Sequence, residues 1–189
     1  MLDDKLKFNV HIKLLCKKNS KSIGIIYVLS KYLSLPSLIS IYYTLVYPYL
    51  IYCSLAWGQT YATHLKPLVI LQKKVLRIIN KVPYNSHTNY LFFSNSILKL
   101  EDLIKYRQAV YMYCNINNQY VRSHHYSTRH RSNLLPPFQR LSSTQQSLSF
   151  SAPSIWNQIP NELKYAPSLP TFKSTLKIFY CSNYNTDAM

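Results

Sequence analysis

The residues of this chain best suited to chemistry are four closely spaced cations, Lys73, Lys74, Arg77 and Lys81. On a helix that rises about 1.5 Å per residue they span about 12 Å, a length that matches several phosphates of a duplex. A helix face that is only solvated usually carries Glu or Asp three or four residues from its cations, and none is present here. The spacing therefore predicts contact with a nucleic-acid backbone, which positions the ligand without distinguishing its sequence.

Two further groups extend this predicted interface. Lys17, Lys18 and Lys21 lie in an earlier helical segment and are expected to assist the four cations. Tyr84 and His87 follow the basic segment, and their rings can stack on a base or a sugar. For Tyr84, packing into the core is an equally good interpretation.

The charge balance also points to a polyanionic partner. The chain has 189 residues and a formal net charge of +16, and between Lys5 and Leu100 it holds thirteen Lys or Arg and no Asp or Glu. Self-repulsion of this kind destabilises a fold unless a phosphate backbone, releasing its condensed counterions, compensates for it. Nucleic acid is therefore the first partner to test, and anionic lipid is the second.

No catalytic residue, metal site or cofactor is predicted. Asp3 and Asp4 are adjacent and so point apart, whereas two-metal chemistry needs several carboxylates at one site. The histidines of residues 124–130 have no cysteine or carboxylate nearby to complete a zinc site. Gly24 and Gly58 are the only glycines, which excludes the glycine-rich phosphate loops of nucleotide-binding proteins.

The composition is typical of a folded protein with reduced thiols. Hydrophobic residues make up 48% of the chain, enough for a core. Its four cysteines are thirty or more residues apart and form no CxxC pair. We therefore expect an intracellular protein, in the nucleus or the cytoplasm.

Hydrophobic periodicity predicts a mostly helical fold. Apolar residues at helical spacing favour helices over about 8–33, 36–47, 62–81, 98–115 and 168–180. We expect residues 1–116 to form a small helical bundle and residues 117–149 to form a loosely ordered basic linker. Residues 150–189 are expected to form a tail with a short helix, packed by Trp156 and Phe172.

One uncharged segment leaves an alternative open. The stretch from Leu35 to Trp57 is long enough to span a bilayer. In this alternative it forms a membrane helix, and the flanking lysines lie near anionic lipid headgroups. Pro36, Pro48 and the polar residues between them favour two shorter buried helices instead, with a restart at Pro48.

Several segments together resemble the C-terminal end of the reverse transcriptase of non-LTR (LINE-type, jockey-like) retrotransposons. The similar segments cover most of the chain: Leu2–Phe8 with His11-Ile12, Lys21–Gly24, Tyr42–Leu50 running to Trp57-Gly58, Leu71–Lys74 with Arg77–Ile79, Pro83-Tyr84 with His87-Thr88, Ala152–Pro160, and Ser168–Lys173. In this resemblance Asp3-Asp4 follows the palm and does not correspond to the catalytic Tyr-x-Asp-Asp motif of the family.

The resemblance implies a thumb domain of a transposable element's RNA-directed DNA polymerase, which clamps the template-primer duplex. It implies RNA–DNA hybrid or duplex nucleic acid as the partner, together with a palm and fingers that this chain lacks. We therefore expect a fragment that does not polymerise alone. The alternatives are an inactive transposon relic with no function of its own and the membrane-associated protein described above.

Overall fold

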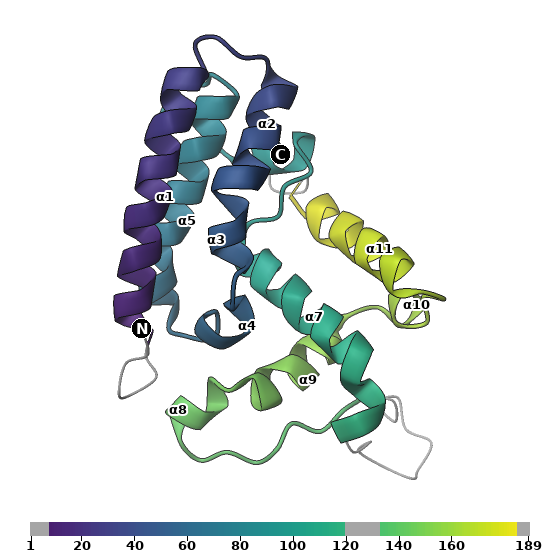
Figure 1. The fold of residues 1–189 in the computed structure, drawn as a ribbon. Helices are drawn as coiled ribbons and strands as arrows, with labels where there is room; N and C mark the ends of the chain where they lie inside the picture. The colour runs from purple at the N-terminus through teal and green to yellow at the C-terminus, as the bar shows by residue number, and fades with distance from the viewer. Residues whose placement is uncertain (1–7, 120–132, 185–189) are drawn as a thin grey trace.

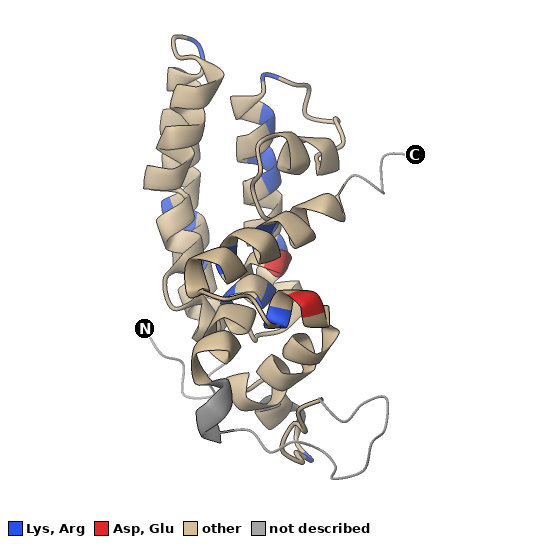
Figure 2. Cartoon of the chain, turned by 90° about the vertical axis from the view of Figure 1, so that its right-hand side faces the viewer, with Lys and Arg blue, Asp and Glu red and all other residues tan. Residues whose placement is uncertain are grey.

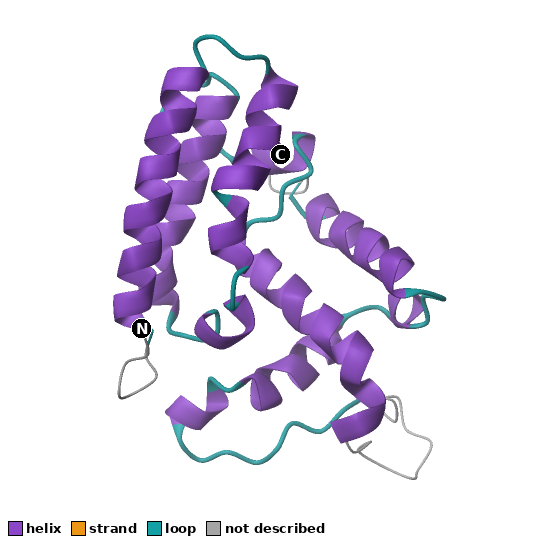
Figure 3. Cartoon of the chain, viewed as in Figure 1, coloured by secondary structure: helices purple, strands orange, loops and turns teal. Residues whose placement is uncertain are grey.

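The computed structural model describes residues 8–119 and 133–184, and Figures 1 and 3 show only helices and loops over these residues. The helices, in chain order, are α1 (Asn9–Leu29), α2 (Leu35–Leu45), α3 (Tyr47–Ile51), α4 (Ser54–Trp57), α5 (Ala62–Ile79), α6 (Asn89–Ser94), α7 (Leu100–Gln119), α8 (Ser142–Gln145), α9 (Leu148–Gln158), α10 (Asn161–Lys164) and α11 (Leu169–Ser182). The prediction of a mostly helical bundle is confirmed.

Helices α1 and α5 lie side by side and run in the same direction, with α2 and α3 beside them (Figure 1). Both helices are amphipathic, and each buries one face. On α1 the buried apolar residues are Ile12, Leu15, Ile23 and Ile26, and on α5 they are Leu65, Leu68, Val75, Leu76 and Ile79. Because the two helices are parallel, their C-terminal ends meet at one end of the bundle.

The C-terminal helices pack on α7. The rings of Trp156 in α9 and Phe172 in α11 lie 5.9 Å apart, as the sequence predicts, and Phe172 also stacks on Tyr113 of α7 at 4.5 Å. The Tyr113 hydroxyl donates a hydrogen bond of 2.7 Å to the carbonyl of Ala166. Of the predicted linker 117–149, residues 120–132 lie outside the described residues. Residues 117–119 instead end α7, and the later part of the predicted linker contains α8 and the first residues of α9.

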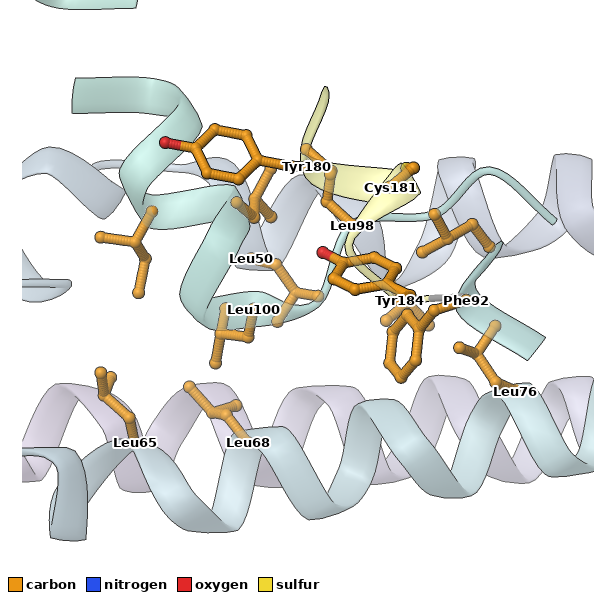
Figure 4. Close-up of a cluster of buried hydrophobic side chains, with 14 of the residues drawn as sticks. Leu50, Leu65, Leu68, Leu76, Phe92, Leu98, Leu100, Tyr180, Cys181 and Tyr184 are labelled. Carbon is orange, nitrogen blue, oxygen red and sulfur yellow. The ribbon is translucent and has the colours of Figure 1, made fainter. Parts of the chain in front are cut away.

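One hydrophobic cluster joins the helices around α1 and α5 to the C-terminal helices that pack on α7. Figure 4 shows Leu68 of α5 pointing toward Leu100 at the start of α7, and Leu76 pointing toward Phe92 of α6. Tyr180 and Cys181 of α11 are buried in the same cluster. Burial of these side chains removes apolar surface from water, and each Å² of buried apolar surface contributes about 25 cal/mol to the stability of the fold.

One buried polar side chain, Gln72 of α5, connects three elements. Its amide nitrogen donates to the Tyr42 hydroxyl at 3.1 Å and to the carbonyl of Leu98 at 2.9 Å. Its amide oxygen accepts from the backbone N–H of Leu100 at 2.8 Å. Since both ends of the amide are bonded, its burial is compensated, and the position of α7 relative to α5 is fixed. Burial raises the pKa of Tyr42.

The uncharged segment Leu35–Trp57 forms three separate helices, α2, α3 and α4, where the sequence favoured two. Pro48 is the second residue of α3, so a new helix begins there as predicted. The chain turns again before α4, where Cys53 has a left-handed backbone with φ of 51°. Over residues 8–119 and 133–184, no helix has both the length and the apolar composition that crossing a membrane requires.

Candidate nucleic-acid interface

A groove of about 700 Å³ lies where the C-terminal ends of α1 and α5 meet. We call it the α1–α5 groove. Its lining residues come from α1 and the turn after it, from α5, and from the loop after α5: Ser20, Ile23, Gly24, Tyr27, Ser30, Lys31, Lys74, Arg77, Ile78, Lys81, Val82 and Tyr84. The groove thus unites residues more than fifty positions apart in the chain.

Among the described residues, the charged side chains that line the groove are all positive. Lys31 comes from the turn after α1, Lys74 and Arg77 from α5, and Lys81 from the residues just after α5. No Asp or Glu is among the lining residues. Figure 2 shows how greatly Lys and Arg outnumber Asp and Glu over the described chain. Four cations around one concave surface form a site that favours a phosphate-bearing ligand.

Two exposed tyrosine rings accompany these cations. The guanidinium carbon of Arg77 lies 5.4 Å from the centroid of the Tyr84 ring, and the ammonium of Lys31 lies 5.7 Å from that of Tyr27. Tyr27 is 56% exposed and Tyr84 is 71% exposed. The interpretation of Tyr84 as a core residue is therefore wrong, because its ring is mostly in solvent.

The loop that carries Tyr84 is tied to α5. The Nε of Arg77 donates a hydrogen bond of 3.0 Å to the carbonyl of Ser86. Lys81 adopts a left-handed backbone with φ of 54°, which ends α5 and turns the chain. The N–H of Val82 then bonds back to the carbonyl of Arg77 at 3.1 Å. These contacts hold Tyr84 at the edge of the groove.

The structure separates the seven cations that the sequence grouped. Lys74, Arg77 and Lys81 line the α1–α5 groove. Lys73 does not, because it is half-buried beside a smaller pocket of about 150 Å³ that also contains Lys99 and Glu101.

The three cations predicted on α1 also lie outside the groove. Lys17 and Lys21 are exposed on α1. The ammonium of Lys18 lies 5.4 Å from the ring centroid of Tyr49, a residue of α3. His87 is exposed and is not a lining residue.

Lys31 and Tyr27 are groove residues that the predicted interface did not include. A sequence signal for them exists, because the two are four positions apart within the predicted helix 8–33 and would share one face of it. Their proximity to Lys74 and Lys81 could not be inferred, because it depends on how α1 packs on α5.

Metal-ligating side chains and cysteine thiols are the other candidates for chemistry in the described part of the chain. There, no group of three or more His, Cys, Asp or Glu side chains converges as metal ligands would. Burial raises the pKa of the Cys16 and Cys181 thiols, which disfavours the reactive thiolate. Asp3, Asp4 and the histidines of residues 124–130 lie outside the described residues.

Comparison of the chain with models of protein families, with curated proteins and with solved structures finds no match.

Proposed function

We propose that the chain binds the backbone of an RNA–DNA hybrid or a nucleic-acid duplex through the α1–α5 groove, as the thumb-like part of a retrotransposon reverse transcriptase. One observation carries the proposal: Lys31, Lys74, Arg77 and Lys81 line one groove, and no carboxylate lies among its described lining residues. The resemblance of the sequence to the C-terminal end of such enzymes supports the same ligand. Nucleotide transfer is not part of the proposal, because it requires a palm.

The binding energy in this proposal comes from counterion release. Each phosphate that a lysine neutralises frees condensed cations, so the logarithm of the association constant falls with the logarithm of salt concentration by about 0.9 per contact on duplex DNA. Such contacts fix the position of the ligand and do not distinguish its bases. We therefore expect binding that depends steeply on salt and weakly on sequence.

The test is a salt titration of a labelled RNA–DNA hybrid with the wild-type chain and with a groove variant. The variant combines Lys31→Gln, Lys74→Gln and Lys81→Gln. It retains Arg77, whose bond to Ser86 holds the loop. If each lysine neutralises one phosphate, the variant loses about 2.7 units of the salt slope.

A matched control removes the same charge elsewhere. Lys13, Lys66 and Lys173 are exposed and lie outside the groove, so their replacement by Gln should leave most of the slope intact. Equal losses in the two triple variants would show that only net charge matters, and the proposal would then be overturned. No loss in the groove variant would overturn it as well.

A further inference from the structure

The α1–α5 groove has an apolar floor that a phosphate backbone does not require. Ile23, Ile78 and Val82 lie among the lining residues, together with the four cations. Ile23 is only 4% exposed, and the other two are half-buried. Contact with these side chains removes apolar surface of a ligand from water, so the groove suits a ligand that carries an apolar part beside its phosphates.

We propose that the groove accommodates an unpaired base of a single-stranded segment next to the bound duplex, with Tyr84 as its stacking surface. This inference rests on the proposed function and specifies its ligand further. Sites for single-stranded nucleic acid combine cations along the backbone with aromatic side chains on which bases stack, regardless of sequence. Arg77 and Tyr84 form such a pair, at 5.4 Å.

The size of the groove agrees with this ligand. Pockets for small molecules measure about 300–1,000 Å³. The groove, at about 700 Å³, has the dimensions for a nucleotide unit. An unpaired base is free to enter it, whereas the bases of a duplex are stacked and paired.

Gly24 leaves the α1 wall of the groove open. A Cβ built at this position meets no heavy atom within 4 Å, apart from the chain neighbours and the backbone of its own helix. A planar ligand can therefore approach the backbone of α1 at Gly24. The same space allows a substitution that fills the groove without removing any of its charges.

The experiment compares three ligands that carry a fluorescent label on the duplex. They are a blunt RNA–DNA hybrid, the same hybrid with a short single-stranded extension, and the hybrid with an extension of equal length that is abasic. The two extensions have the same phosphates, so any difference in affinity between them comes from the bases. We expect the extension with bases to bind about tenfold more tightly than the abasic one.

Two variants test whether the groove is responsible. Tyr84→Ala removes the stacking ring, and Gly24→Leu fills the open wall, so each should abolish the difference between the two extensions. For each variant the readout is the ratio of its affinities for the two extensions, because a general change in hybrid binding alters both affinities alike and leaves this ratio unchanged. The matched controls are Tyr165→Ala, an 81% exposed tyrosine outside the groove, and Gly24→Ala, which adds only one methyl group. Both controls should retain the difference.

The outcomes separate this inference from the proposed function. If wild type binds the hybrid but gains nothing from the bases of the extension, the inference is overturned and the proposed function stands. A difference that persists in both Tyr84→Ala and Gly24→Leu also overturns the inference. If wild type does not bind the hybrid with a salt-dependent affinity, the proposed function itself fails.

Discussion

The hydroxyl of Tyr184 donates a hydrogen bond of 2.7 Å to Oδ2 of Asp102, which lies 82 positions earlier in the chain. The same hydroxyl accepts a bond of 3.1 Å from the backbone N–H of Lys99. Tyr184 is 3% exposed, and its ring lies 6.2 Å from that of Phe92. Burial and the bond to Asp102 raise the pKa of Tyr184. The residues after α11 are thereby attached to the beginning of α7.

The first prediction concerns this attachment. Tyr184→Phe keeps the buried ring but removes both hydrogen bonds, which leaves the Lys99 N–H without this acceptor. We expect the free energy of unfolding to fall by about 1–2 kcal/mol, since the side chain of Asp102 is partly exposed and water replaces some of the loss. Urea denaturation followed by circular dichroism measures the change.

The control for this prediction is Tyr165→Phe. Tyr165 is 81% exposed, so removing its hydroxyl should change the free energy of unfolding by no more than about 0.5 kcal/mol. Equal effects of the two substitutions would mean that the Tyr184 bonds contribute no more than a solvated hydroxyl does.

The two glycines give a second prediction with opposite signs. A Cβ at Gly58 would overlap the carbonyl oxygen of Ser54 and lie 2.9 Å from Ile104, so Gly58→Ala should destabilise the fold by about 1–3 kcal/mol. At Gly24 the space is open and the residue is inside α1, so Gly24→Ala should stabilise by about 0.5–1 kcal/mol. Thermal melts of both variants measure the shifts. Shifts in the same direction would contradict this account.

The long helices could be predicted because their sequences carry a local signal. The apolar positions of α5 repeat at helical spacing, and the structure places this helix at Ala62–Ile79, against a predicted 62–81. Pro36 lies in the first turn of α2, and Ser168 caps α11 by accepting a bond from the N–H of Thr171. In each case the residues that define the element are neighbours in sequence.

Helix α9 shows why other elements could not be predicted. It contains Pro153, which disfavours a helix interior, and several serines, which favour turns. Its buried residues Ala152 and Trp156 pack in the hydrophobic core, and Ser151 accepts a hydrogen bond from Gln108 of α7 at 2.9 Å. Tertiary packing overrides the local preference here, and a short periodic pattern does not reveal it.

The candidate site could be predicted only in part, because some of its residues are brought together by tertiary packing. Lys74, Arg77 and Lys81 share one face of α5 and its end, as the spacing indicates. Lys73 precedes Lys74 by one residue and so points about 100° away, toward the pocket that contains Glu101. Lys31 comes from the turn after α1, and only the packing of α1 on α5 brings it to the groove.

This difference between sequence and structure gives a third prediction. Lys31→Gln should lower the salt slope of hybrid binding by about one unit, because it removes one phosphate contact from the groove. Lys73→Gln should change the slope by clearly less, because Lys73 lies outside the groove. Binding isotherms at several salt concentrations measure both slopes. A larger effect at Lys73 than at Lys31 would favour the interface inferred from spacing alone over the α1–α5 groove.

The fourth prediction concerns pH and His11 in α1. Its ring lies 6.3 Å from that of the buried Trp57, and its Nε2 is buried with no hydrogen-bond partner within the described residues. Burial lowers the pKa of His11 below its ordinary value of about 6.5, and the positive charge of Lys18 adds to the effect. The folded state therefore resists a proton that the unfolded chain accepts.

The sign of the effect follows from this difference in proton binding. Below a pH of about 6.5 the unfolded chain binds more protons at this position than the folded one, so the free energy of unfolding falls as the pH decreases toward the folded-state pKa of His11. His11→Phe keeps a ring against Trp57 and removes the proton site, so its stability should vary less with pH in this range. Urea denaturation at a series of pH values measures both curves, with His87→Gln as the control at an exposed histidine. If the stability of His11→Phe varies with pH as much as that of wild type, His11 does not cause a loss of stability at low pH and the prediction is wrong.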